Sequence, residues 1–300
     1  MRGADLLVES LVTAGVKRVF ALSGNQIMSI FDASIGTSIN LIHTRHEAAA
    51  VHMADAWGRI NDEPGIALVT AGPGFANALS ALYVAKMAES PLILFSGHTP
   101  TRQLGMGAFQ EMPQAELAGH LCKASWMVKN TNDIYDDVAK AFQIARSGRP
   151  GPVHLSLPAD LLDAEVSLKD DFSPHANDFV PQSGQISEND IEMISKSLSQ
   201  SERPLILAGP AMSRNSSREV LELLSKKGFP ALGMESPRGT NDPSLGAFAE
   251  ILFKADLIVL LDKKWDFTLQ FGSEEIISTN AKIIQIDSDK DVLNLTSATL

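Results

Sequence analysis

Short apolar segments that alternate with helical patterns restrict the fold of this chain more than any other feature of its sequence. Residues 66–70 and 91–96 are almost entirely apolar, which is typical of strands buried on both faces of a sheet. Residues 75–87 lie between them, are rich in small and apolar residues, and predict a helix. Strands that alternate with helices in this way form a parallel sheet that is covered on both sides. We therefore predict an α/β fold.

The same alternation starts again after a polar stretch, which predicts a second domain. Residues 164–186 are polar and contain two prolines, so we expect a linker there. We expect a first domain over residues 1–163 and a second over residues 187–300, each with an open, mostly parallel sheet and helices on both faces. In the second domain, strands are predicted at 204–208, 257–261 and 282–286. No closing helix is expected after the last of these strands.

The composition fits an enzyme of the cytoplasm. The net charge of −11 argues against nucleic acid or an anionic membrane surface as the main partner. No apolar run approaches the roughly 20 residues that a membrane span needs, and the first ten residues do not form a signal peptide. Cys122 is the single cysteine, which suits a reducing compartment and argues against cysteine-rich metal sites.

Glu47 lies where an apolar strand runs into an alanine-rich helix. The strand is expected at residues 39–44, and small side chains after Glu47 make the helix thin enough for another element to come close. A carboxylate in the first turn of a helix is stabilised by the positive end of the helix dipole. Taken alone, this local pattern fits an ordinary first-turn glutamate as well as it fits a functional one.

Residues 72–77 form a glycine-rich turn between a predicted strand and a predicted helix. The turn does not match a dinucleotide fingerprint, because Asn77 takes the place of the third glycine and the next strand ends without an acidic residue. One interpretation is a tight turn that lets the helix pack closely. The other is a backbone surface close to a flat ligand, with Asn77 as a hydrogen-bonding group. Local sequence leaves both open.

A long loop is expected at residues 97–121, after a buried strand, where loops are often functional. Within it, residues 109–111 (Phe-Gln-Glu) fit the lining of a pocket as well as the start of a helix. His46 and His98 each follow a strand, where a site would form. The histidines near Glu47 have no metal-ligand partners in the sequence, so we expect no metal to be bound there.

Together, eight segments resemble the N-terminal, pyrimidine-binding domain of thiamine-diphosphate enzymes of the acetolactate synthase type. They are residues 3–9, 19–24, 45–48, 54–59, 70–77, 91–97, 107–111 and 145–152. Residues 187–300 are similar, more loosely, to the central domain of the same family. The resemblance implies a thiamine-diphosphate-binding fold followed by a Rossmann-like domain that the sequence leaves incomplete at its C-terminal end.

The resemblance also implies a reaction. In this family, the glutamate matched by Glu47 bonds to N1′ of the aminopyrimidine ring and thereby helps to remove the proton from C2 of the thiazolium ring. The cofactor then accepts electrons as CO₂ leaves a 2-keto acid. By this resemblance, the chain is expected to be part of a carboligase or decarboxylase that acts on 2-keto acids, with Glu47 as the catalytic acid and base.

The matched motifs assign roles to further residues. Cofactor binding is implied for Ser23, Gly24, Glu47, Thr70, Gly72, Pro73, Gly74 and Asn77. Substrate binding is implied for Asn25, His98, Phe109, Gln110 and Lys123. Two departures affect these roles. Residues 23–25 (Ser-Gly-Asn) replace the usual Pro-Gly-Gly beside the cofactor, and His98 replaces a glutamine, which leaves the substrate open.

Cofactors and partners follow from the same resemblance. Residues 261–267 replace the flavin-contacting pattern of the central domain, so we do not expect FAD to bind. The Gly-Asp-Gly and Asn-Asn elements that hold Mg²⁺ and the diphosphate belong to a third domain, and no Gly-Asp-Gly occurs in these 300 residues. We interpret the chain as a truncated sequence or as one subunit of a split enzyme. Family sites form between subunits, which implies a homodimer or homotetramer.

Two alternatives stay open. A 2-hydroxyacyl-CoA or oxalyl-CoA lyase or decarboxylase of the same family has a similar turn helix and a similar Cys-Lys-Ala segment at residues 122–124. A non-catalytic binding protein built on two α/β domains is the other alternative, because a fold does not determine a function.

Overall fold

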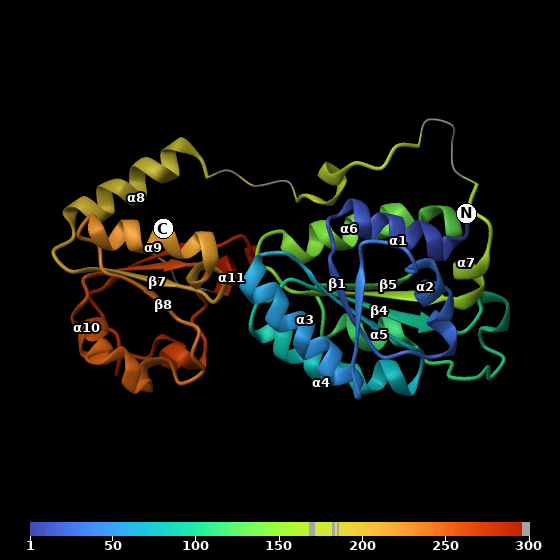
Figure 1. Ribbon diagram of the computed structural model, residues 1–300. Helices are drawn as coiled ribbons and strands as arrows, with labels where there is room; N and C mark the ends of the chain where they lie inside the picture. Colours follow the sequence, from blue (N-terminus) through green and yellow to red (C-terminus); the bar gives the residue numbers. More distant parts are fainter. Residues whose placement is uncertain (168–171, 182–183, 185, 296–300) are drawn as a thin grey trace. The chain divides into compact units, whose positions relative to one another are not determined.

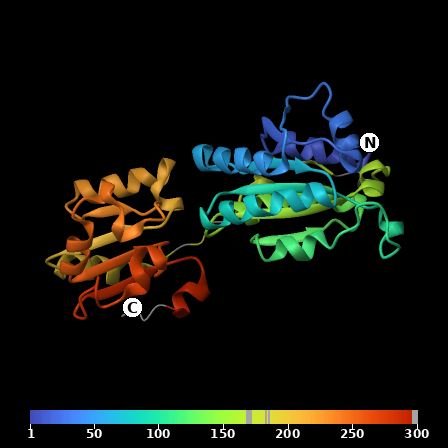
Figure 2. The same ribbon diagram turned by 90° about the horizontal axis from the view of Figure 1, so that it is seen from below.

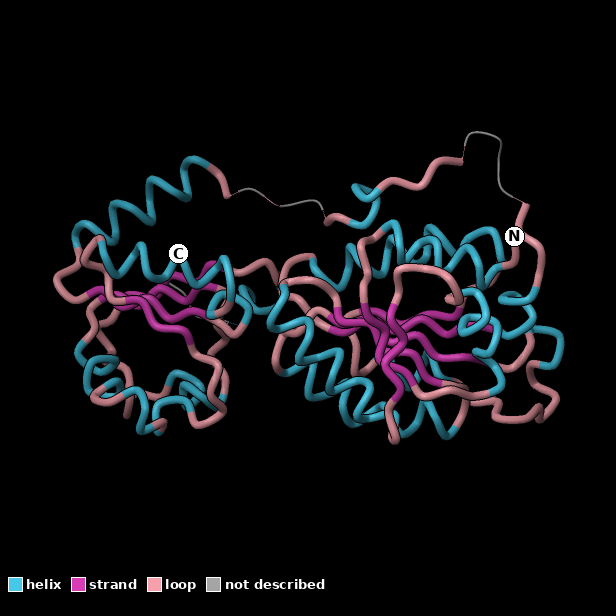
Figure 3. The backbone as a smooth tube through the Cα atoms, in the orientation of Figure 1, coloured by secondary structure: helices cyan, strands magenta, loops and turns pink. Residues whose placement is uncertain are grey.

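The computed structural model describes residues 1–167, 172–181, 184 and 186–295. The chain forms two compact units, residues 1–182 and 183–300. Each unit contains one open sheet, of six strands in the first and four in the second, and all strands in both sheets are parallel. Figure 3 shows the strands at the centre of each unit with helices on both sides. The predicted α/β class is confirmed.

The sheet of the first unit has the strand order β2-β1-β3-β4-β6-β5. Its strands are β1 (Arg18–Ala21), β2 (Asn40–His43), β3 (Gly65–Val69), β4 (Leu92–His98), β5 (Ala124–Met127) and β6 (Pro152–Pro158). Its helices are α1 (Gly3–Thr13), α2 (Met28–Ala33), α3 (Glu47–Asn61), α4 (Pro73–Met87), α5 (Gln114–Gly119), α6 (Ile134–Arg146) and α7 (Ala159–Asp163). Helices α1 and α6 cover one face, and α3, α4 and α5 cover the other (Figure 1).

Successive residues of the central strands point into two different cores. In β3, Ile66 and Leu68 belong to the core beneath α1 and α6, whereas Ala67 and Val69 belong to the core beneath α3 and α4. Because side chains alternate along a strand, a strand with a core on each side needs apolar residues at every position. This is the physical reason for the continuous apolar runs in the sequence.

Parallel pairing brings the carboxyl ends of these strands to one edge of the sheet. Loops at this edge of an open α/β sheet usually form the ligand site. Helix α3 follows β2 directly, and α4 follows β3 directly, so both begin at this edge. The two helices lie side by side (Figures 1 and 2). The edge therefore carries the start of α3, the turn before α4 and the loop after β4.

Part of the predicted linker packs on the first unit. Phe179 is only 2% exposed and makes edge-to-face ring contacts with Tyr135 and Phe142. The hydroxyl of Tyr135 donates a hydrogen bond of 2.7 Å to the carboxylate of Asp178. The polar composition of this segment concealed an aromatic anchor, which belongs to the core beneath α1 and α6.

The second unit has the strand order β10-β9-β7-β8. Its strands are β7 (Pro204–Ala208), β8 (Ala231–Gly233), β9 (Leu257–Leu261) and β10 (Lys282–Ile286). Its helices are α8 (Glu188–Gln200), α9 (Asn215–Lys226), α10 (Phe248–Lys254) and α11 (Lys290–Leu295). Strands β7, β9 and β10 have the predicted bounds. The expectation of no helix after β10 is wrong, because α11 follows it.

Helix α5 lies inside the predicted long loop. It has only six residues, and a helix of less than two turns is too short to show an apolar period in the sequence. Within the described part of the chain, no helix has the length and apolar character needed to cross a membrane.

Helix α3 packs closely against the sheet, as its small side chains predicted. A Cβ atom on Gly65 would lie 1.9 Å from the carbonyl oxygen of Ala54 on α3. A Cβ atom on Gly58 of α3 would lie 2.2 Å from the carbonyl oxygen of Pro91. Neither backbone oxygen can move aside easily, so both positions require glycine.

We predict that Gly58→Ala destabilises the protein, although alanine is the better helix former. The new methyl group meets backbone, and overpacking of this kind costs about 1–3 kcal/mol. Gly119→Ala in α5 is a matched control, because no atom lies within 4 Å of the added Cβ. Urea unfolding should show a change within about 0.5 kcal/mol for this control. Equal stabilities of the two variants would contradict the close packing.

Candidate functional site

Glu47 lies buried at the carboxyl edge of the first sheet. It is the first residue of α3 and is 8% exposed. One carboxylate oxygen, Oε2, accepts a hydrogen bond of 2.9 Å from the side-chain amide of Asn77 on α4. His46 caps the helix, and its Nδ1 accepts a hydrogen bond of 3.1 Å from the backbone N–H of Ala48. A buried carboxylate is thus held between the starts of two neighbouring helices.

The turn before α4 brings backbone close to this carboxylate. Gly72 has a φ of +60°, which favours glycine, and Pro73 is the first residue of the helix. A Cβ atom on Gly74 would lie 3.3 Å from Oε1 of Glu47 and 2.7 Å from Cγ2 of Thr70. The missing side chain at Gly74 therefore lets the backbone of the turn lie close to Thr70 and to this carboxylate oxygen of Glu47.

Thr70 connects this turn to the loop after β1. A Cβ atom on Gly24 would lie 2.4 Å from Cβ of Thr70, so the two loops touch. The hydroxyl of Thr70 donates a hydrogen bond of 2.6 Å to Oε1 of Gln26. Ser23 and Asn25 flank Gly24, and both are exposed. The loop after β1 thus forms one rim of the site.

The loop after β4 forms another rim. The ring nitrogens of His98 lie 3.2 Å and 3.0 Å from the carbonyl oxygens of Thr99 and Met112. The hydroxyl of Thr99 donates to the carbonyl of Phe109 at 3.3 Å, and the Phe109 side chain is 71% exposed. The contacts of His98 with Met112 and of Thr99 with Phe109 therefore hold this loop on the end of β4. The aromatic ring of Phe109 faces solvent.

Gln110 lies against the glycine turn. A Cβ atom on Gly72 would lie 2.8 Å from Cβ of Gln110, and Gln110 itself has a φ of +61°. Next to it, the backbone N–H groups of Gly105 and Ala108 donate hydrogen bonds to the carboxylate of Glu111. These bonds lower the pKa of the Glu111 carboxyl group, and the bond from Gly105 has the larger effect. The loop is folded back on itself at the site.

Lys123 does not join this site. It precedes β5 at the amino end of the sheet, where its backbone N–H donates to the carbonyl of Pro152. Its ammonium group donates to the carbonyl oxygens of Ile144 and Ser147 at the end of α6. Burial lowers the pKa of Lys123 to about 8. The structure therefore corrects the expected place of Lys123 near the substrate, since the carboxyl edge lies at the other end of the strands.

The structure brings together most of the residues that the resemblance pointed to. They are Gly24, Glu47, Thr70, Gly72, Pro73, Gly74, Asn77, His98 and Gln110. Sequence reasoning missed Gln26 and Gln114, both of which are buried and bond to residues of this set. Gln114 lies inside the long loop that the sequence predicts at residues 97–121. Neither position carried a local signal.

A buried polar network lies behind the loop after β4. His154 of β6 has one ring nitrogen 2.8 Å from the hydroxyl of Ser96 and the other 2.8 Å from the hydroxyl of Ser125. Burial lowers the pKa of His154 from 6.5 to about 3. The ring therefore stays neutral and joins β4, β5 and β6.

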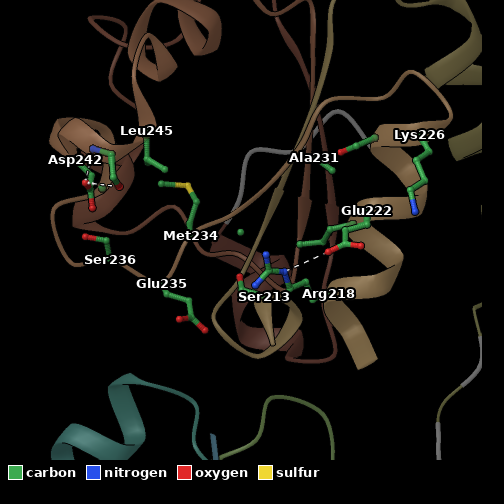
Figure 4. Close-up of a pocket in the computed structure, with 15 residues that line it drawn as sticks. Ser213, Arg218, Glu222, Lys226, Ala231, Met234, Glu235, Ser236, Asp242 and Leu245 are labelled. Atoms are coloured by element: carbon green, nitrogen blue, oxygen red, sulfur yellow. Dashed lines mark hydrogen bonds and ion pairs between the residues drawn. The ribbon is translucent and has the colours of Figure 1, made fainter. Parts of the chain in front are cut away.

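The second unit has a pocket of its own, with a volume of about 670 Å³ (Figure 4). It is lined by residues of α9 and β8 and by the segment 234–245. Two charged residues of the pocket pair with each other, since Nε of Arg218 lies 3.4 Å from Oε1 of Glu222. None of the site residues predicted from the sequence lines this pocket.

The segment that replaces the flavin-contacting pattern packs into its own unit. Lys263 is 2% exposed, and its ammonium group lies 2.7 Å from the carboxylate of Asp266. The carbonyl oxygen of Asp262 would lie 1.9 Å from a Cβ atom on Gly209, so this backbone closes on the end of β7. Among the described residues, no group of three or more His, Cys, Asp or Glu side chains could hold a metal ion.

Comparison with known proteins decides the family of the first unit. Residues 1–117 match the family described as "Thiamine pyrophosphate enzyme, N-terminal TPP binding domain". Residues 1–117 belong to this family. Thiamine pyrophosphate is another name for thiamine diphosphate, so the domain family itself implies this cofactor. The suspected resemblance is confirmed.

Homologues extend over most of the chain. A "Probable acetolactate synthase large subunit" of Methanocaldococcus jannaschii is 30% identical over 96% of this chain and 51% of its own length. "Acetolactate synthase isozyme 3 large subunit" of Escherichia coli is 42% identical over 56% of this chain and 29% of its own length. A "2-hydroxyacyl-CoA lyase 2" of Danio rerio is 32% identical over 97% of this chain and 53% of its own length. The chain thus spans about half the length of the relatives that match nearly all of it.

We predict that neutral His154 makes the stability of the first unit depend on pH. Its pKa is about 3 in the folded state and 6.5 when unfolded, so the unfolded state binds more protons between these values. Stability is therefore lost as the pH falls below about 6.5, by about 1.4 kcal/mol per pH unit. Urea unfolding between about pH 6.5 and 5 should show a shallower pH slope for His154→Asn. Equal slopes would contradict the neutral ring.

Proposed function

We propose that this chain is the N-terminal part of an acetolactate synthase-like, thiamine-diphosphate-dependent carboligase or decarboxylase that acts on 2-keto acids. The observation that carries the proposal is the buried carboxylate of Glu47, held by Asn77 close to the backbone of the turn at Gly74. A flat aminopyrimidine ring needs a backbone surface without side chains and a carboxylate at its edge. The carboxyl edge of the first sheet offers both.

Several residues of this edge would contribute to holding the cofactor, each in a different way. Thiamine diphosphate, when bound, supplies an electron sink for the bond that breaks next to the keto group. Glu47 would share a proton with a ring nitrogen through the carboxylate oxygen that faces Gly74. Asn77 orients the other oxygen, at 2.9 Å. Thr70 and Gly24, which touch each other, support the turn from behind, with Ser23 at the rim.

We propose that the substrate meets the residues on the loops around this turn. Phe109 and Gln110 lie on the loop after β4, Asn25 lies after β1, and His98 lies at the end of β4. A 2-keto acid is small and anionic, and a closed loop around it would exclude water from the reacting bond. Lys123 has no part in this proposal, because it lies at the amino end of the sheet.

The remaining parts of the site lie outside this sequence. The relatives that match the chain are about twice as long. We propose that Mg²⁺ and the diphosphate are held by residues outside positions 1–300, on a second subunit of a homodimer or homotetramer. The proposal includes no flavin, since residues 261–267 replace the flavin-contacting pattern of the central domain.

A second candidate function is a 2-hydroxyacyl-CoA or oxalyl-CoA lyase. It is favoured by the Danio rerio relative, which matches 97% of this chain at 32% identity. The same Glu47 would serve in either reaction. The two candidates differ in the substrate and not in the role of the first unit.

In the full-length enzyme, Glu47→Gln should lower turnover by about 10²–10⁴-fold, because an amide cannot share the proton that a carboxylate can. The size and hydrogen bonding of the side chain are nearly retained, so urea unfolding should change little. Glu63→Gln is the control, since Glu63 is an exposed glutamate at the other end of α3. Unchanged turnover in Glu47→Gln would contradict the role of Glu47.

Substrate assays of the full-length enzyme should separate the two candidate functions. We expect pyruvate and 2-ketobutyrate to be decarboxylated and joined, with kcat/KM at least about tenfold above that for oxalyl-CoA or a 2-hydroxyacyl-CoA. The measurement is release of CO₂ together with detection of the ligated product. Preference for an acyl-CoA substrate would replace the first candidate with the second.

A further inference from the structure

Gln114 occupies a central place behind the glycine turn. It is the first residue of α5 and is 1% exposed. Its Oε1 accepts a hydrogen bond of 2.8 Å from the backbone N–H of Gly72. Its Nε2 lies 2.9 Å from the carbonyl oxygen of Gly97 and 3.0 Å from the hydroxyl of Ser156. One side-chain amide thus joins the turn after β3 to the ends of β4 and β6.

The partners of Gln114 determine which way its amide faces. Gly72 presents an N–H and needs an acceptor, whereas Gly97 presents a carbonyl and needs a donor. A carboxylate could serve only the first, and an apolar side chain could serve neither. The amide is therefore the group that satisfies both strand ends at once.

Several buried hydrogen bonds hold this side chain in place, including one of 2.8 Å from its Nε2 to the hydroxyl of Ser96. A cavity of about 420 Å³ lies beside it, lined also by His98, Met112 and Ser156. A side chain without these bonds no longer fixes the N–H of Gly72. The position of the Gly72 turn thus depends on the bonds that Gln114 makes.

The Gly72 turn, in turn, sets the start of α4. Gly72 is the residue before the helix, and its carbonyl accepts from the backbone N–H of Ala76 at 2.8 Å. The first turns of α4 carry Gly74 and Asn77, which meet the two oxygens of Glu47. A shift of the turn therefore moves both contacts of the carboxylate.

We propose that Gln114 is a positioning residue of the thiamine diphosphate site. By fixing the N–H of Gly72, it places the start of α4 so that Glu47 and the glycine turn fit the pyrimidine ring together. This inference rests on the proposed function and adds a residue that touches neither the cofactor nor the substrate.

The test measures, by calorimetry, the binding of thiamine diphosphate to the full-length protein at saturating Mg²⁺. Gln114→Met removes all of these polar contacts at similar volume and should raise the Kd by about tenfold or more, at least the cost of one lost buried hydrogen bond. The side chain in Gln114→Asn is one methylene shorter and cannot reach Gly72, so this variant should show the same rise in Kd as Gln114→Met.

Gln285→Met in the second unit is the matched control. Gln285 is 8% exposed, and its Nε2 donates to the carbonyl of Lys263 at 3.1 Å, so its loss also breaks buried hydrogen bonds. It should lower the urea midpoint without changing the Kd for thiamine diphosphate. In Gln114→Met, KM for pyruvate measured at saturating cofactor should change less than this Kd.

The possible outcomes distinguish the two proposals. A wild-type protein that binds the cofactor, with Gln114→Met and Gln114→Asn binding equally well, would overturn the positioning role alone. An equal loss of affinity in Gln285→Met would also overturn it, because that result would indicate general destabilisation. A wild-type protein that binds no thiamine diphosphate would overturn the proposed function, and this inference with it.

Discussion

A carboxylate taken out of water needs a hydrogen-bonding partner, and the structure of the first unit is arranged so that Glu47 has one. Burial of an unpaired charge is costly, whereas a bond to an amide stabilises it. Asn77 supplies that bond at 2.9 Å, but it comes from a different helix, α4. The two helices must therefore start at the same edge of the sheet and lie close together. Parallel strands β2 and β3, each followed directly by its helix, meet this requirement.

The close approach of backbone at this edge depends on residues that have small side chains or none. Gly74 lets the turn lie close to Glu47, Gly24 touches Thr70, and Gly58 lets α3 lie on the sheet. The small or absent side chains that let the helix pack closely also provide a backbone surface on which a flat ring could lie. Close packing and the proposed binding of a flat ring thus both require small residues, which explains why alanine and glycine are concentrated here.

Much of the fold could be predicted from the sequence, because the apolar runs of β3, β4, β7 and β9 have a simple physical cause. A strand with a core on each face must be apolar throughout, and this pattern is visible without a structure. Helix α5 could not be predicted, since six residues are too few to show a period. The anchor at Phe179 was concealed by polar neighbours. In the site, the motif residues near Glu47 came together, but Lys123 did not, because matching a segment does not tell which end of the strand faces the ligand. Gln114 escaped notice because its importance comes from partners distant in the sequence.

The central claim is that Glu47 meets the pyrimidine ring of thiamine diphosphate beside the glycine turn before α4. A crystal structure of the full-length protein with the cofactor and Mg²⁺ measures this directly. The account predicts an oxygen of Glu47 within about 2.6–3.2 Å of N1′, the range of a catalytic hydrogen bond. A cofactor bound with its pyrimidine ring away from α3 and α4, or with N1′ facing another residue, would contradict the account.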